Sequence, residues 1–317
     1  MPLPPILQGR LSLPVIGAPM FIVSGPDLVI AQCKAGIVGA FPALNARPAQ
    51  MLGVWLERIG RELAEFAAAN PEAPVAPYAV NQIVHASNAR LADDMRVCEA
   101  HRVPIVITSL RPPDEVVAAV HGWGGIVFHD VISVRHAEKA IRAGVDGLIL
   151  VCAGAGGHAG TLSPFALLQE IRAFYDGPIA LSGAIASGAA ILAAEALGAD
   201  LAYIGTRFIA TQEANADQRY KQMLVDGAAS DIVYTSLFTG VAGNYLRPSI
   251  AAAGMDPDRL EPAAKSRMDF AASATPWRDI WGAGQGLGAI LDAPQVSTVV
   301  ERLSLEYMAA KGRLCGK

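Results

Sequence analysis

The stretch SVRHAEKAIRAGVDGLILVCAGAGGH, Ser133 to His158, contains one helix, one strand and a glycine-rich turn in that order. Ser133 is placed to cap the helix and Gly144 to end it, because serine favours the N-cap and glycine the residue after the last turn. The run GLILVCAG that begins at Gly147 is apolar without alternation, which indicates a strand buried on both faces. This order predicts a parallel α/β protein.

Seven further apolar runs repeat this design along the chain. They are LPVIGAPM from Leu13, GIVGAFP from Gly36, PYAVNQ from Pro77, VPIVITSL from Val103, GIVFHD from Gly125, PIALSGA from Pro178 and LAYIGT from Leu201. Helical patterns separate them, including a long amphipathic helix over about residues 46–70 and a capped helix from Ser187 to Gly198. Eight strands, each followed by a helix, predict a (β/α)8 TIM barrel. An open, doubly wound sheet is the alternative.

Composition limits the kinds of partner. The 317 residues are 52% hydrophobic and 17% charged, with a net charge of −4 and no run of lysine or arginine. This pattern argues against nucleic acid or an acidic membrane surface as the main partner. No apolar run approaches the ~18 residues of a membrane span, and the first residues lack the features of a signal peptide. Four cysteines without a CxxC pair indicate reduced thiols, so we expect a cytoplasmic protein.

Small and polar residues gather at the ends of the predicted strands, where the active site of a TIM barrel lies. They are Ala18, Pro19 and Met20, Asn81 and Gln82, Thr108 and Ser109, Asp130, Gly156 and Gly157, Ser182, Gly183 and Ala184, and Gly205 and Thr206. The last two groups follow the seventh and eighth strands, where barrels often bind phosphate through backbone N–H groups. Ordinary turn chemistry is the alternative explanation for their glycines.

Two titratable residues stand out at these strand ends. His158, flanked by glycines, is predicted to act as a general base or hydrogen-bond donor near its ordinary pKa of ~6.5, with a simple loop hydrogen bond as the alternative. Asp130 is expected to accept a hydrogen bond from a ligand hydroxyl or ring N–H. Neighbouring strand residues point to opposite faces, so His129 and Asp130 are not expected to share a metal ion. No lysine falls at a strand end, which favours a phosphorylated cofactor over Schiff-base chemistry.

Several motifs together resemble a known family. PVIGAPM, VNQ, AGAGGHAG, LSGAIASG and ALGADLAYIGTRFIATQEA are similar to motifs of the nitronate monooxygenase (2-nitropropane dioxygenase-like) flavoproteins. The likeness covers about residues 10–215, and WGAGQGLG near the C-terminus also resembles the family. That family also includes NADH:quinone reductases and FMN-dependent enoyl-ACP reductases.

The resemblance implies FMN bound without a covalent link over the barrel mouth. It assigns Ala18, Pro19 and Met20 to the isoalloxazine ring, Asn81 to a polar contact, Gly156 and Gly157 to backbone beside the ring, His158 to catalysis, and Ser182, Gly183, Ala184, Gly205 and Thr206 to the phosphate. Asp130 departs from the pattern, because some quinone-reductase relatives carry lysine there. We accordingly expect an FMN-binding TIM barrel over residues 1–212 and 285–317, and a helical substrate-side segment over 213–284.

The resemblance also implies oxidation of an alkyl nitronate by O2. His158 would hydrogen-bond the nitro oxygens or remove the α-proton of a nitroalkane, and Phe21, Ile22, Tyr245 and Leu246 would either shape a small pocket or pack in the core. One alternative is NAD(P)H-dependent reduction of a quinone or an enoyl thioester. Another is a flavin-free barrel that binds a phosphorylated metabolite. A homodimer is compatible with the sequence, and no metal is expected.

Overall fold

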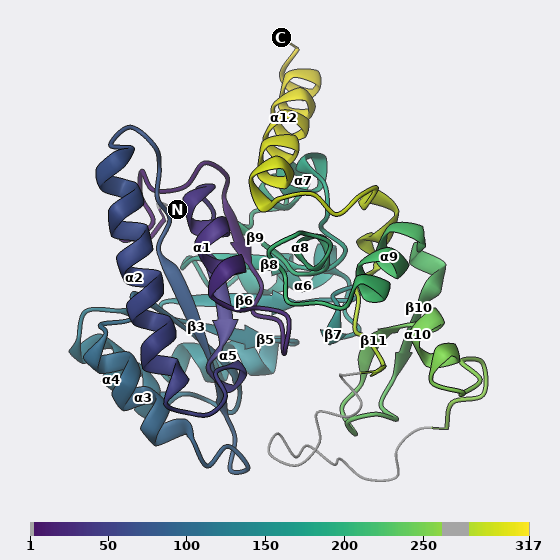
Figure 1. The fold of residues 1–317 in the computed structure, drawn as a ribbon, viewed down its shortest axis with the longest axis horizontal. Coiled ribbons are helices and arrows are strands. Elements are labelled where there is room, and N and C mark those ends of the chain that lie inside the picture. The colour runs from purple at the N-terminus through teal and green to yellow at the C-terminus, as the bar shows by residue number, and fades with distance from the viewer. Residues whose placement is uncertain (1–2, 262–278, 317) are drawn as a thin grey trace.

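Eight parallel strands form one sheet at the centre of the molecule. The structure, a computed structural model, describes residues 3–261 and 279–316 (Figure 1). The strand order is β1-β9-β8-β6-β5-β4-β3-β2. The strands are β1 (Val15–Gly17), β2 (Gly39–Pro42), β3 (Tyr78–Val84), β4 (Ile105–Leu110), β5 (Ile126–Val131), β6 (Gly147–Val151), β8 (Ile179–Ser182) and β9 (Leu201–Ile204). Each overlaps one of the predicted apolar runs, and β3 and β5 extend beyond theirs, to Val84 and Val131.

The sheet closes between its first and last members. Ile16 of β1 forms a parallel bridge with Val38, immediately before β2. The N–H of Gly17 donates to the carbonyl of Val38 over 2.7 Å, and the N–H of Val38 donates to the carbonyl of Val15 over 3.0 Å. The predicted TIM barrel is therefore confirmed, and the open doubly wound sheet is wrong.

Helices surround this sheet, as the alternation of patterns predicts. They are α1 (Pro26–Lys34), α2 (Met51–Ala69), α3 (Leu91–Ala100), α4 (Asp114–Gly122), α5 (Val134–Arg142), α6 (Pro164–Arg172), α7 (Gly188–Ala196), α8 (Thr206–Ile209) and α12 (Val296–Cys315). Ser133 caps α5 by accepting from the N–H of His136, and Ser187 caps α7 by accepting from the N–H of Ala190. Among the described helices, none combines the length and apolar character of a membrane span.

Helix α2 is shorter at its start than predicted. It begins at Met51, and a 3-10 turn over Ala43–Asn45 stands before it. Pro48 explains the difference, because proline disfavours helical backbone at the residue before it and has no N–H to donate. This leaves residues 43–50, which include the 3-10 turn, as the loop that connects β2 to α2.

The barrel interior is apolar at the end where the strands begin. Its side chains come from every strand: Ile16, Val38, Ala40, Ala79, Ile105, Ile107, Phe128, Ile149, Ala180, Leu201 and Tyr203. Leu7, fully buried, joins them from the N-terminal segment, which is anchored where Ser12 N–H donates to the carbonyl of Gly36 before β2. Because this end is filled, a ligand has room only where the strands finish.

The described part of the segment after α8 contains strands as well as helices. It contains α9 (Gln218–Asp226) and α10 (Arg247–Ala252), but also β10 (Ile232–Thr235) and β11 (Gly243–Leu246). These strands form an antiparallel sheet with β7 (Gly157–His158), in the order β10-β11-β7. The β-branched and aromatic residues of IVYT, at 232–235, favour a strand. Residues 262–278 of this predicted segment lie outside the described residues, and its division from the barrel stays a prediction.

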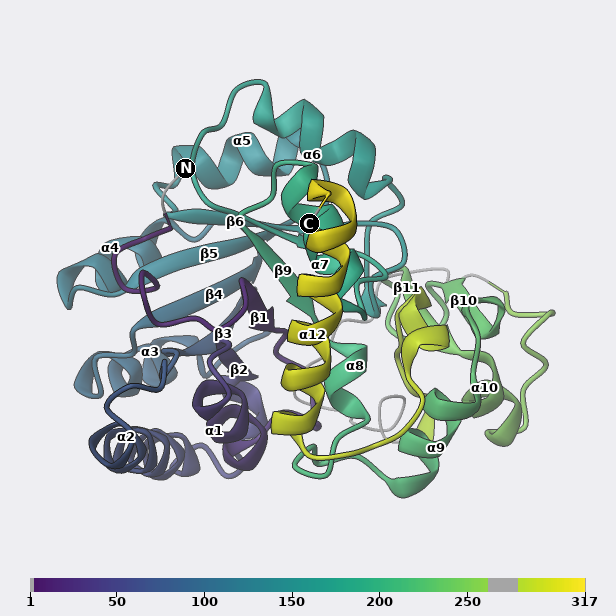
Figure 2. The same ribbon diagram turned by 90° about the horizontal axis from the view of Figure 1, so that it is seen from above.

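Figures 1 and 2 place this small sheet on the side of the barrel opposite α2, α3 and α4. Helix α12 packs along α7 and contacts α1 (Figure 2). At that contact the N–H of Gly188 donates to Glu306 Oε2 over 2.7 Å, and the Tyr307 hydroxyl donates to Glu195 Oε2 over 2.5 Å. The C-terminal helix thus belongs to the helical layer around the barrel.

Candidate active site at the carboxyl end of the barrel

One cavity of about 910 Å³ lies at the ends of the barrel strands. Its size falls within the range of ordinary ligand and cofactor sites. The residues predicted to bind the cofactor or to act in catalysis all line it: Ala18, Pro19, Met20, Asn81, Asp130, Gly156, Gly157, His158, Ser182, Gly183, Ala184, Gly205 and Thr206. The structure therefore brings all of these positions together around one space, while their individual roles stay predictions.

A directed chain of hydrogen bonds follows β3, β4 and β5 into this cavity. Asn81 Nδ2 donates to the carbonyl of Ile107 over 3.2 Å and to Ser109 Oγ over 2.9 Å. Ser109 in turn donates its hydroxyl proton to Asp130 Oδ2 over 2.6 Å. Both amide protons of Asn81 are used, so the chain can run in only one direction, toward Asp130. We call these three residues the side-chain end of the cavity.

Asp130 has an oxygen without a partner. Its Oδ1 atom is buried and accepts no hydrogen bond from the described residues. Burial raises the pKa of Asp130 to about 6, and the hydrogen bond from Ser109 opposes that shift. A buried acceptor without a donor costs free energy. The arrangement therefore suits an occupant of the cavity that donates a hydrogen bond, or a proton on Oδ1.

The residues next to this chain point away from the cavity, which corrects two expectations. Gln82 Nε2 donates to Cys98 Sγ over 3.5 Å, and Thr108 Oγ1 lies 2.8 Å from His129 Nδ1. Gln82 and Thr108 are buried outside the cavity, because successive strand residues face opposite sides. His129 likewise faces away from Asp130, as the alternation predicts, and burial lowers its pKa to about 4.

The turn after β8 presents main chain to the cavity. Gly183 has a φ of +132°, and a Cβ there would lie 2.7 Å from the carbonyl oxygen of Ala153. Only glycine fits such a position. Ala184 also has positive φ, +56°, and its N–H donates to the carbonyl of Gly154 over 3.3 Å. This N–H, expected to serve a phosphate, therefore already has a partner within the protein.

The turn after β9 retains a donor. Thr206 Oγ1 accepts a hydrogen bond from the N–H of Gly284 over 2.9 Å. A hydroxyl that accepts in this way keeps its own proton for another acceptor. Thr206 can therefore donate to a group in the cavity. We call the turns after β8 and β9, with the glycines against them, the main-chain end.

Three glycines of this end are absent from the predicted site. Gly154, Gly284 and Gly286 line the cavity, and a Cβ at Gly284 would lie 2.6 Å from the carbonyl oxygen of Gly154. A Cβ at Gly286 would lie 2.9 Å from the Cβ of Ala186. The close glycines of WGAGQGLG, residues 281–288, were the available signal, but they lie far along the chain from the barrel strands.

His158 lies on the short strand β7, opposite Gly243 of β11. Its Nε2 is 2.7 Å from Thr239 Oγ1, a residue 81 positions later that no sequence pattern indicated. Burial lowers the pKa of His158 to about 4, below the ordinary value expected from the sequence. The imidazole is therefore neutral at pH 7 and is a weaker base than predicted.

Apolar side chains make up much of the remaining wall. Of the two alternatives for these side chains, Phe21 and Ile22 line the cavity, whereas Tyr245 and Leu246 are buried in the protein core. Among the described lining residues there is no lysine or arginine. Within residues 3–261 and 279–316, no three His, Cys, Asp or Glu side chains are grouped to hold a metal ion.

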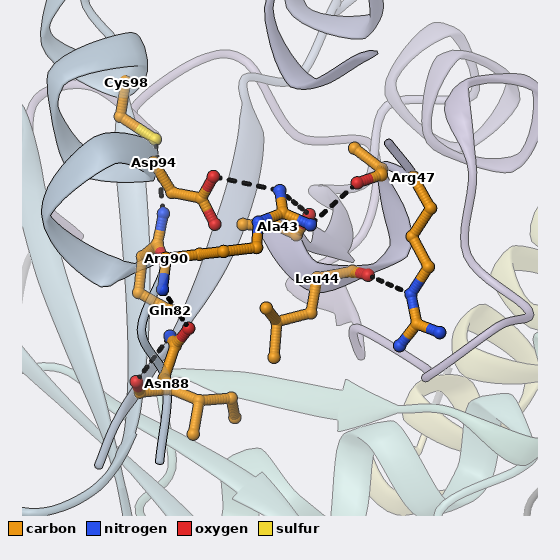
Figure 3. A network of polar contacts seen from close by, with 10 residues as sticks. Ala43, Leu44, Arg47, Gln82, Asn88, Arg90, Asp94 and Cys98 are labelled. Atoms are coloured by element: carbon orange, nitrogen blue, oxygen red, sulfur yellow. Dashed lines mark hydrogen bonds and ion pairs between the residues drawn. The ribbon is translucent and has the colours of Figure 1, made fainter. Parts of the chain in front are cut away.

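An ion pair between the half-buried Arg90 and the buried Asp94 holds the loop after β2 against this wall (Figure 3). Arg90 donates to the carbonyls of Ala46 and Ala43, over 2.9 Å and 3.3 Å, and pairs with Asp94 over 2.9 Å. Leu44, between the two carbonyls, lines the cavity. The guanidinium thus replaces the hydrogen bonds that a loop outside regular structure lacks.

Comparison with known proteins places the chain in a family. The profile of the nitronate monooxygenase family matches residues 7–252. The chain belongs to the nitronate monooxygenase family. A curated nitronate monooxygenase of Paraburkholderia phytofirmans is 28% identical over 293 residues, covering 79% of this chain and 78% of that protein. Family membership makes the protein an oxidoreductase.

Other relatives carry different activities in their names. A (3aS,4S,5R,7aS)-5-hydroxy-7a-methyl-1-oxo-octahydro-1H-indene-4-carboxyl-CoA dehydrogenase of Rhodococcus jostii is 26% identical over 237 residues, which are 75% of this chain and 63% of that protein. Solved structures agree on the fold. A FabK mutant of Thermotoga maritima matches with a TM-score of 0.78 and 24% identity, over 98% of this chain and 97% of that one. Nitroalkane oxidase from Streptomyces ansochromogenes matches with a TM-score of 0.76 and 24% identity, over 98% and 99%.

Proposed function

We propose that the protein binds FMN non-covalently in the cavity and oxidises alkyl nitronates with O2. One observation carries the proposal: every residue that the resemblance assigns to the coenzyme lines the same cavity as His158. Membership of the nitronate monooxygenase family supports the reaction class.

The lining residues fit FMN at both ends. At the main-chain end, the glycine turn at Gly183 and the Thr206 hydroxyl would hold the phosphate, because glycine lets backbone approach an anion closely. At the side-chain end, Asp130 Oδ1 would accept a ring N–H, which resolves its unpartnered state. When bound, FMN supplies the acceptor for the substrate's electrons, which O2 finally receives.

The environment of His158 bears on the choice of substrate. A neutral nitroalkane must lose its α-proton, and an imidazole whose pKa is about 4 is a weak base for that step. A nitronate reaches the site already deprotonated. It needs only a hydrogen-bond partner for its nitro oxygens, which a neutral imidazole can provide through an N–H. This difference favours nitronates over nitroalkanes as substrates of the protein.

Replacing His158 tests this function. His158→Ala should retain FMN and lose at least about 100-fold in kcat/KM for propionate 3-nitronate, the scale of a lost catalytic proton or hydrogen-bond partner. His101→Ala is the matched control, because His101 is exposed and lies outside the cavity. Full turnover by His158→Ala, measured as nitronate-dependent O2 consumption, would remove His158 from the reaction.

The volume of the cavity supports a second candidate, NAD(P)H-dependent reduction of a quinone or an enoyl thioester. About 910 Å³ lies near the upper end of ordinary ligand sites and leaves room for more than a small nitronate beside FMN. Anaerobic mixing separates the two candidates. Rapid bleaching of the flavin by NADH would contradict the monooxygenase proposal, and bleaching by a nitronate alone would support it.

A further inference from the structure

The hydrogen bonds from Asn81 through Ser109 run toward one carboxylate, Asp130. Ser109 receives a hydrogen bond from Asn81, so its single hydroxyl proton is given to Asp130 Oδ2. The other oxygen, Oδ1, is buried and has no donor among the described residues. Since nothing further in this chain of hydrogen bonds can satisfy Oδ1, its partner must be an occupant of the cavity or a proton.

Within residues 3–261 and 279–316, no lysine or arginine of the cavity wall offsets the charge of Asp130. Its neighbours on β4 and β6 are the hydroxyl of Ser109 and the apolar run GLILV. From β9, Tyr203 faces Asp130, and burial keeps the pKa of its phenol well above neutral. From α5, His136 is hydrogen-bonded to Ser133, and burial lowers its pKa. The described cavity wall has no lysine or arginine, so no side-chain cation of that wall would offset a second negative charge placed beside Asp130.

Reduction of FMN creates such a charge, because two electrons with one proton leave the ring one unit more negative. A proton on Oδ1 removes this repulsion, and the oxygen keeps a lone pair that can still accept the ring N–H. We propose that Asp130 takes up one proton from solvent when FMN in this cavity is reduced, and so sets how the reduction potential depends on pH. This inference rests on the proposed binding of FMN.

The balance of the step is simple. Two electrons from the reductant enter FMN, one proton joins FMN and one joins Asp130 Oδ1, and no bond of the protein breaks. Burial raises the pKa of Asp130 to about 6, so below that pH the carboxyl is already protonated in the oxidised protein. Only one proton then accompanies reduction. The potential should therefore follow pH steeply above about pH 6 and less steeply below it.

Spectroelectrochemical titration of the FMN-loaded protein, from about pH 5 to about pH 9, tests the step. For a two-electron couple, each proton taken up changes the equilibrium constant of reduction tenfold per pH unit, which shifts the potential by about 30 mV. The pH at which the slope changes, near 6, is called the break. Above it, the equilibrium constant of reduction should change 100-fold per pH unit in the native protein, about 59 mV, but only tenfold in Asp130→Asn. Asp217→Asn is the control, because Asp217 is a carboxylate on the same wall that is already paired with Arg219. It should keep the native slope.

Each outcome decides a separate claim. Equal slopes in the native protein and in Asp130→Asn, with FMN bound to both, would overturn the inference. A native protein that binds no FMN would overturn the proposed function instead. If Asp130→Asn does not take up FMN, Ser109→Ala provides a second test. It removes the bond that lowers the pKa of Asp130, so the break should move to higher pH, and an unmoved break contradicts the inference.

Discussion

The two ends of the cavity use different parts of the chain for the same task. The side-chain end consists of Asn81, Ser109 and Asp130, whose polar atoms reach in from three neighbouring strands. The main-chain end consists of turns such as Gly183, where a side chain does not fit. An end built from side chains can be adjusted by substitution while the backbone stays in place. At the other end the backbone itself meets the ligand, so substitution changes the fold of the turn.

The largest effect is expected from Gly183→Ala. The added Cβ would meet the carbonyl oxygen of Ala153 at 2.7 Å, in a backbone conformation with φ of +132° that alanine avoids. The turn must then shift, and we expect FMN affinity to fall by about 100-fold, equivalent to about 2.7 kcal/mol. Titration of the protein with FMN, followed by fluorescence, measures the change.

Gly124→Ala is the control for this strain. Gly124 also has positive φ, +83°, but no atom lies within 4 Å of its added Cβ. It should lower stability by about 1 kcal/mol and leave FMN affinity intact. Native affinity in Gly183→Ala would end the distinction between the two ends.

Asn81→Ala should have a smaller effect on the side-chain end. Without its amide, Ser109 loses the donor that orients its hydroxyl, and the carbonyl of Ile107 loses a partner. We expect FMN affinity to fall about tenfold, close to the net value of one or two hydrogen bonds. Gln82→Ala is the control, because Gln82 is the next residue in the chain and its side chain faces Cys98. It should lower the free energy of unfolding and leave FMN binding unchanged. Equal losses of affinity in both variants would contradict the assignment.

Acid should destabilise the protein through two histidines, His129 and His158, whose pKa values are lowered by burial to about 4. Between about pH 6.5 and 4 the unfolded chain therefore binds more protons than the folded protein, and stability is lost as the pH decreases. Asp130 acts in the opposite direction, because its raised pKa lets the folded state bind the extra proton. Each histidine should account for about 1 kcal/mol between pH 7 and pH 5.5. Urea unfolding of His129→Gln at these two pH values should show a smaller loss than the native protein, and an unchanged loss would contradict it.

The sequence predicted the barrel and its cavity for one physical reason. Parallel strands buried on both faces are continuous apolar runs, and their carboxyl ends meet on one side. Asn81, Asp130 and Gly183 could therefore be assigned to one site without knowledge of any contact. The same continuity hides which residues face inward, since a run apolar on both sides has no alternation. For that reason Gln82 and Thr108 were placed beside the ligand, although they face outward.

The small sheet was not predicted, because two residues carry no strand pattern. Gly157 and His158 form β7 only by pairing with β11, which lies far along the chain. The contact between His158 and Thr239 depends on that pairing and spans 81 residues. The depressed pKa of His158 follows from burial in this arrangement, which local sequence does not reveal.

Strands β10 and β11 form a hairpin, and Thr239 between them contacts His158. This hairpin belongs to a part of the chain that contributes no strand to the barrel. Lengthening, shortening or recombining that hairpin can change the surroundings of the imidazole while the eight-stranded scaffold keeps its sequence. New reactivity can thus evolve in this architecture through changes in a peripheral module.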